Sequence, residues 1–181
     1  HAGVRHDFAR LLTQEGRPEE AIELLHEAIQ LGTMNVTLWS LGSQIVNGHL
    51  TDADIALRWT DCAIQEDHKH PEIRKQRAIA LLSAGQFKEA LPFFEAPSSS
   101  DNPLNESARM ICQLMTGESV ALSYCNREKT ISIAVANWCR RLIERGQESA
   151  VRKINDQLHH LDLILPTAAQ VLREALPDVN N

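Results

Sequence analysis

Two stretches far apart in the chain share one pattern, in which a glycine is followed five residues later by an alanine that opens an amphipathic run. The stretches are "GRPEEAIELL" at 16–25 and "GQFKEALPFF" at 85–94. A pattern that returns within one chain predicts helix–turn–helix units that bury their apolar faces by stacking on one another. This constraint favours a fold built from repeated helix pairs.

The period can be measured from the glycines that follow apolar helical runs. They are separated by 32, 37, 32 and 29 residues and are Gly16, Gly48, Gly85, Gly117 and Gly146. Glycine adopts the left-handed conformation at the end of a helix without steric cost, so we predict a tight turn at each. Ala21, Ala56 and Ala90, separated by 35 and 34 residues, would let two helix axes approach closely.

Composition agrees with an all-α fold. The 181 residues are 43% hydrophobic but only 4% aromatic, which favours contacts between helices over a β-sandwich. The β-branched run "TISIAV" at 130–135 also permits a strand. We favour a helix there, because the apolar positions continue with helical spacing through Ile143, too far for an ordinary strand.

The organisation along the chain follows from these elements. Residues 1–96 are predicted to form three helix pairs. The stretch "PSSSDNP" at 97–103 contains two prolines and three serines and is predicted to be a linker. Residues 104–181 are predicted to hold degenerate helical repeats and a C-terminal capping helix.

Several motifs resemble the tetratricopeptide repeat (TPR) family. They are "LWSLG" at 38–42, the turns "GRPEEA" and "GQFKEA", and the runs "AIELLHEAI" and "ALPFFEA". The resemblance is clear over about residues 2–96 and weak afterwards. It implies an α-α superhelix of stacked antiparallel helix pairs, a TPR-like solenoid whose first helices line a concave groove. Three arginines depart from the family pattern: Arg5 and Arg74 where a large residue is usual, and Arg77 in place of an apolar one.

The groove residues are predicted from helical spacing, because positions i, i+4 and i+7 of the first helix in each pair share one face. This face comprises His6, Arg10 and Thr13 in the first pair, Trp39, Ser43 and Val46 in the second, and Lys75, Ile79 and Leu82 in the third. Trp39 would be an apolar anchor, and Arg10 or Lys75 would pair with a carboxylate. The alternative is that Trp39 packs between helices and the charged side chains face water.

These predictions favour a protein-interaction module without catalysis of its own. Its partner would be a peptide or helix of another protein, acidic and with apolar anchors. The two-unit carboxylate clamp of some family members is absent, because the matching positions carry His6, Arg10, Ser40, Glu72 and Gln76. Two alternatives remain open: a substrate-positioning arm of a larger enzyme such as a transferase, and a self-assembly element that forms homo-oligomers.

Charge and hydropathy disfavour other classes of partner. The net charge of −6 would repel a nucleic-acid backbone. No apolar run approaches the ~20 residues needed to cross a bilayer, and we expect a cytoplasmic location. The dispersed cysteines, Cys62, Cys112, Cys125 and Cys139, are expected to be reduced thiols.

No cofactor, metal or catalytic site is predicted. The histidines of "DHKH" at 67–70 and "HHLD" at 159–162 lack the i, i+4 spacing that places two metal ligands on one helix face. Ser123 and Cys125 lie in no recognisable nucleophile motif. The glycines are isolated, so no phosphate-binding loop is expected.

Overall fold

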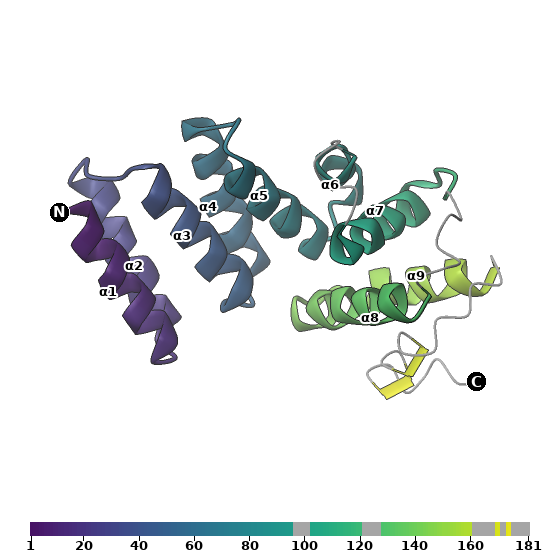
Figure 1. Cartoon of the computed structure of the whole chain (residues 1–181). Coiled ribbons are helices and arrows are strands. Elements are labelled where there is room, and N and C mark those ends of the chain that lie inside the picture. Colours follow the sequence, from purple (N-terminus) through teal and green to yellow (C-terminus); the bar gives the residue numbers. More distant parts are fainter. Residues whose placement is uncertain (96–101, 121–127, 161–168, 171–172, 175–181) are drawn as a thin grey trace. The chain divides into compact units, whose positions relative to one another are not determined.

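The computed structural model describes residues 1–95, 102–120, 128–160, 169–170 and 173–174. These residues form α-helices and no strand (Figure 1). In chain order the helices are α1 (Ala2–Gln14), α2 (Pro18–Gln30), α3 (Val36–Gly48), α4 (Ala53–Glu66), α5 (Pro71–Ser83), α6 (Phe87–Phe94), α7 (Pro103–Thr116), α8 (Glu128–Glu144) and α9 (Glu148–His160). The all-α prediction is confirmed, and the run at 130–135 is helical, since it lies inside α8.

Local sequence signals explain where several helices begin. Pro18 and Pro103 occupy the first turns of α2 and α7, where the missing N–H of proline leaves no bond unmade. Asn35 caps α3, because its Oδ1 accepts a hydrogen bond from the N–H of Leu38 at 3.0 Å. Asp52 caps α4 in the same way, by accepting from two backbone N–H groups.

The glycine turns agree with the predicted period at four of five positions. Gly16, Gly85, Gly117 and Gly146 have φ angles between 72° and 78°, in the left-handed region. Gly48 does not, so this part of the prediction is wrong. It remains inside α3, and His49 with φ −126° follows it as the C-terminal cap. The longer connection to α4 removes the need for a tight glycine turn there.

Packing divides the chain into two compact units, His1–Ala80 and Leu81–Asn181. The boundary lies inside α5. Residues 97–101 of the predicted linker lie outside the described residues. Helix α6, before that linker, packs against α7, which begins at its last residue. Proline and serine can end a helix, but they do not decide which helices pack together.

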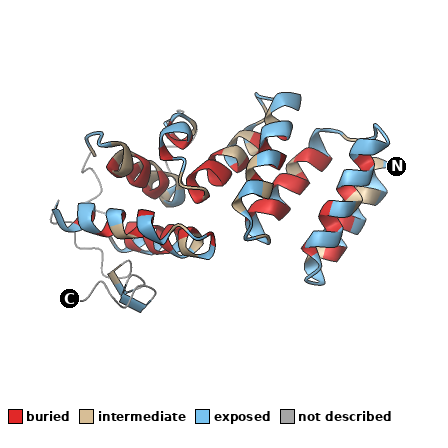
Figure 2. Ribbon diagram, turned by 180° about the vertical axis from the view of Figure 1, so that it is seen from behind, coloured by how far each residue is buried: buried red, intermediate tan, exposed pale blue. Residues whose placement is uncertain are grey.

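In the first unit the buried residues form stripes along the helices (Figure 2). Small residues mark the closest helix contacts, since Ala9, Ala21 and Ala56 are fully buried. Leu25 and Leu38 fill the space beside them and are also fully buried. The unit therefore has one continuous core, built from α1 to α4 with Ile73 and Ala80 of α5.

The second unit has its own aromatic centre. The Phe94 ring meets the Trp138 ring edge to face at a centroid distance of 6.5 Å. Trp138 Nε1 donates a hydrogen bond to the Leu104 carbonyl oxygen at 3.1 Å, which satisfies its buried N–H. The guanidinium of Arg141 lies over the indole, 5.5 Å from the ring centroid. These contacts join α6, α7 and α8.

Candidate functional site: a groove between α1 and α3

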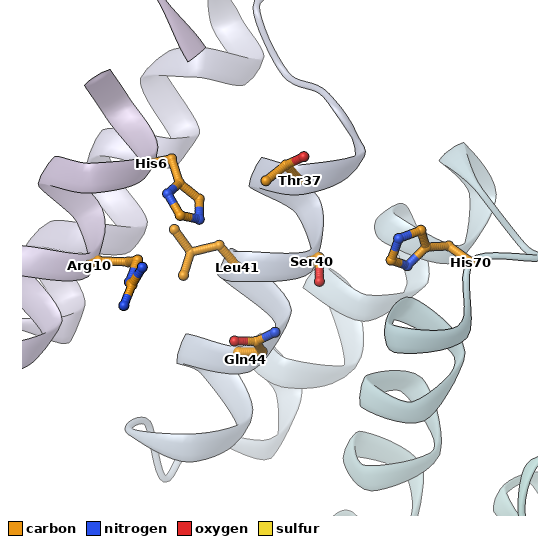
Figure 3. Close-up of a pocket in the computed structure, with 7 residues that line it drawn as sticks. All are labelled: His6, Arg10, Thr37, Ser40, Leu41, Gln44 and His70. Carbon is orange, nitrogen blue, oxygen red and sulfur yellow. The ribbon is translucent and has the colours of Figure 1, made fainter. Parts of the chain in front are cut away.

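A hollow of about 360 Å³ opens between α1 and α3 in the first unit (Figure 3). Helix α1 contributes two side chains, α3 contributes four, and one comes from the residue that precedes α5. The lining residues are His6, Arg10, Thr37, Ser40, Leu41, Gln44 and His70. In Figure 3 the His6 ring lies beside the Leu41 side chain, and His70 lies across α3 from His6.

A second hollow of about 200 Å³ adjoins the first and shares Arg10, Leu41 and Gln44 with it. Its other lining residues lie toward the C-terminal ends of the same two helices and are Thr13, Gln14, Ile45 and His49. Because the two hollows share these residues, they form one depression along both helices. We call it the α1–α3 groove.

The groove is rich in hydrogen-bonding and basic groups. Its lining contains Arg10 and three histidines but no carboxylate, in a chain whose net charge is −6. Two acidic residues lie just outside it. His6 Nδ1 is 3.2 Å from Asp7 Oδ1, and Gln44 Nε2 donates to Glu72 Oε1 at 3.4 Å. The groove itself therefore offers donors to a negatively charged ligand.

The structure brings together the three residues predicted for the first helix. His6, Arg10 and Thr13 all line the α1–α3 groove. Arg10 is exposed, whereas His6 and Thr13 are half-buried. The Thr13 hydroxyl donates to the Ala9 carbonyl oxygen at 2.8 Å, so its hydrogen is already used within α1.

The predicted face of the second helix is not open to the groove. Trp39 is 6% exposed, and Ser43 and Val46 are fully buried. The Ser43 hydroxyl donates to the Trp39 carbonyl oxygen at 2.8 Å, inside α3. The physical reason is that α3 packs against α1, α2 and α4 at once, which buries a wider face than one stripe. Ser40, Leu41 and Gln44 line the groove instead.

The predicted face of the third helix is also mostly buried. Ile79 and Leu82 are both buried. Lys75 is exposed, and its Nζ lies 3.8 Å from Glu72 Oε2 on the same helix. Of the three residues, Lys75 alone is exposed.

Two of the groove residues that were not predicted could have been recognised from their spacing in the sequence. Ser40 and Gln44 are polar residues four apart on α3, and that spacing places them on one face of the helix. His49 and His70 lie outside the helices and carried no such signal.

Arg77, which departs from the repeat pattern, is bound within the first unit. Its Nη1 donates to the Leu57 carbonyl oxygen at 2.7 Å and to Thr60 Oγ1 at 3.2 Å. Its Nη2 donates to Asp61 Oδ1 at 3.1 Å. Arg77 therefore ties α5 to α4, and these donors are occupied by the protein itself.

In the part of the chain that the structure describes, no group of three or more His, Cys, Asp or Glu side chains gathers as a metal site would require. The last two residues of "HHLD" lie outside that part, as do Ser123 and Cys125. No helix within it is both long and apolar enough to cross a membrane.

Two buried thiols are shielded from ionisation. Burial raises the pKa of Cys112 and of Cys139 to about 12. A thiol with such a pKa is protonated at neutral pH and is a poor nucleophile. Cys62, by contrast, is exposed.

Comparison with known proteins supports the fold. No family model matches the chain, and no curated protein sequence matches it. Among solved structures, the chain is similar to "YrrB: a TPR protein with an unusual peptide-binding site", with a TM-score of 0.55 and 15% sequence identity. The match covers 96% of this chain and 86% of that one. The chain therefore has an all-α, TPR-like helical-repeat fold.

Proposed function

We propose that this chain is a protein-interaction module, without catalysis of its own, that binds a peptide or helix of a partner protein in the α1–α3 groove. The observation that carries the proposal is the groove itself, an open depression along two helices with a lining that contains no carboxylate. The similar protein YrrB is described as having a peptide-binding site. That description motivates the same class of ligand here.

The chemistry of the groove favours an acidic segment with an apolar anchor. Arg10 is exposed and presents a planar fork of donors that suits a carboxylate. Ser40 and Gln44 add polar contacts along α3. Leu41 and Ile45 form the apolar part of the lining, where a partner's aliphatic side chain would pack. We therefore propose His6, Arg10, Ser40 and Gln44 as polar contacts to the acidic segment, and the Thr13 hydroxyl oxygen as an acceptor for a backbone N–H of the partner.

A direct test is to select binders from a displayed peptide library on the immobilised chain, and then measure the affinity of a selected peptide by calorimetry. The proposal expects acidic peptides to be enriched. Arg10→Glu should weaken binding at least about tenfold, because an attractive charge becomes a repulsive one. If no peptide is enriched, the proposed function is contradicted. If binding is unaffected by Arg10→Glu, the groove is the wrong site.

A second candidate function, self-association, is favoured by a different observation. Val4, Phe8 and Leu11 follow one another at spacings of four and three residues on α1 and are 69%, 50% and 49% exposed. Such a stripe on one helix is typical of an interaction surface. A copy of the same chain could cover it, with two α1 helices packed around a two-fold axis.

A further inference from the structure

A separate hollow of about 530 Å³ lies between α2 and α4 in the first unit. We call it the α2–α4 pocket. It has no lining residue in common with the α1–α3 groove, and its volume falls in the range typical of ligand sites. The proposed function does not use it.

The floor of the α2–α4 pocket is apolar and rigid. Trp39 and Trp59 are 6% and 4% exposed, and their ring centroids lie 5.2 Å apart. Trp59 packs on the backbone of Gly42, where a Cβ atom would lie 2.6 Å from Trp59 Nε1. The His26 ring also packs on Trp59, with the two ring centroids 5.3 Å apart. These contacts leave the two indoles little freedom to rearrange.

Aliphatic side chains extend this floor toward the surface. Ile22 is buried, Leu50 and Ile55 are half-buried, and Ile29 is 39% exposed. When an apolar group of a ligand covers exposed apolar surface around a preformed hollow, the free energy of the complex is lowered. The α2–α4 pocket thus suits a large aliphatic or aromatic side chain.

Charges at the rim are divided between the two helices. Glu19 and Glu23 are exposed on α2, and their spacing of four residues places them on one face. Arg58 is exposed on α4. No hydrogen bond or ion pair of these three side chains is found among the described residues. The rim is therefore acidic on the α2 side and basic on the α4 side.

We propose that the α2–α4 pocket docks an amphipathic helix of a partner protein, which inserts one large apolar side chain and places a basic residue against Glu19 and Glu23. The charge distribution selects this occupant, because a basic flank on the side of α2 meets two unpaired carboxylates. The apolar floor supplies the anchor site for the inserted side chain. This site is distinct from the proposed groove and takes a ligand of opposite charge.

The probes are two synthetic amphipathic helices without tryptophan. They share the same leucine and phenylalanine positions and differ only in flanking lysine or glutamate residues. Calorimetry should show tighter binding of the lysine peptide. In ¹H–¹⁵N spectra, the indole N–H signals of Trp39 and Trp59 should shift when it binds, whereas that of Trp138 should not.

Three variants test the site. Glu19→Lys with Glu23→Lys should weaken binding of the lysine peptide about tenfold, whereas Arg58→Glu should strengthen it about threefold. A matched control, Glu148→Lys with Asp156→Lys, makes the same change in net charge on α9 and should leave the affinity unchanged. Circular dichroism checks that each variant is folded.

Each other outcome overturns the inference. Equal affinity for the two peptides would remove the role of the rim charges, and unmoved indole signals would place binding elsewhere. Tighter lysine-peptide binding in Arg10→Glu would move it to the α1–α3 groove, because the substitution there replaces a repulsive charge with an attractive one. If the lysine peptide does not bind, and the chain self-associates in a way that Glu19→Lys with Glu23→Lys abolishes, the occupant is a second copy.

Discussion

The indole of Trp59 on α4 lies against the backbone of Gly42 on α3, so that a side chain at Gly42 would occupy the space of the ring. Trp59 Nε1 also donates to the Trp39 carbonyl oxygen at 3.4 Å. Helices α3 and α4 pack against each other at this contact. It depends on the absence of a Cβ atom at Gly42, even though the backbone there is helical.

Gly42→Ala should therefore destabilise the chain, by about 1–3 kcal/mol, because the buried Trp59 ring cannot move aside without disturbing the core. Helix propensity alone would predict the opposite sign, since alanine is the better helix former. Urea unfolding measures the change. Gly48→Ala on the same helix is the control, because nothing lies within 4 Å of a Cβ there; it should be neutral or slightly stabilising. Equal effects of the two substitutions would contradict the packing argument.

Arg77→Ala should lower the free energy of unfolding by about 1–3 kcal/mol, because it removes three hydrogen bonds between α5 and α4. Asp61→Asn should cost less than about 1 kcal/mol, because the Asp61 side chain is 53% exposed and solvent screens its ion pair. Thermal or urea unfolding of both variants checks the difference. A larger loss for Asp61→Asn would show that the ion pair, and not the bonds to Leu57 and Thr60, is what matters.

Arg10→Glu and Trp39→Ala should separate binding from stability. Arg10 is exposed in the α1–α3 groove, so its substitution should weaken peptide binding while stability changes by less than about 0.5 kcal/mol. Trp39 is buried, so its truncation should cost about 3–5 kcal/mol. Calorimetry with a selected peptide and urea unfolding together measure both quantities. A Trp39→Ala protein that is fully stable but cannot bind would restore Trp39 as a groove anchor.

Phe8→Glu tests self-association through α1. If the stripe of Val4, Phe8 and Leu11 joins two copies, the charged substitution should abolish a dimer that sedimentation detects in a concentration series. Stability should change little, because Phe8 is half exposed. Asp7→Glu, on a neighbouring exposed position, is the matched control. A wild-type chain that is monomeric at every concentration would remove this candidate function.

The three cysteines that the structure describes should react with iodoacetamide in a fixed order at pH 8. Cys62 is exposed and should react first, whereas Cys112 and Cys139 should react only when the chain unfolds. Mass spectrometry of digested samples identifies the labelled sites. Rapid labelling of Cys112 in the folded chain would show that the second unit opens readily.

The same two thiols predict a dependence of stability on pH. Burial raises their pKa from 9.0 to about 12, so the unfolded chain loses these protons at lower pH than the folded one. Their contribution is fully present below pH 9 and is lost as pH rises from 9 toward 12. Unfolding free energies measured across this range should fall. A flat profile would contradict the burial of both groups.

The sequence by itself predicted the all-α, repeat-built fold and marked where several helices begin or end. Proline in a first turn, Asn35 and Asp52 as caps, and glycines at left-handed turns are local signals, because each acts through the backbone of its own few residues. The recurring "G-x-x-x-x-A" turn, together with the spacing of apolar residues, was enough to predict the TPR-like fold before any contact was known.

Tertiary structure decided which face of each helix stays open. Sequence periodicity defines which residues of α3 share a face. Which of these faces is buried depends on how α1, α2 and α4 pack around the helix. In the folded chain Trp39 is buried and Gln44 is exposed. The same is true of Arg77, whose partners on α4 lie 16 to 20 residues away in sequence. A local pattern cannot specify such contacts, because burial is a property of everything that packs around a side chain and not of its spacing along one helix.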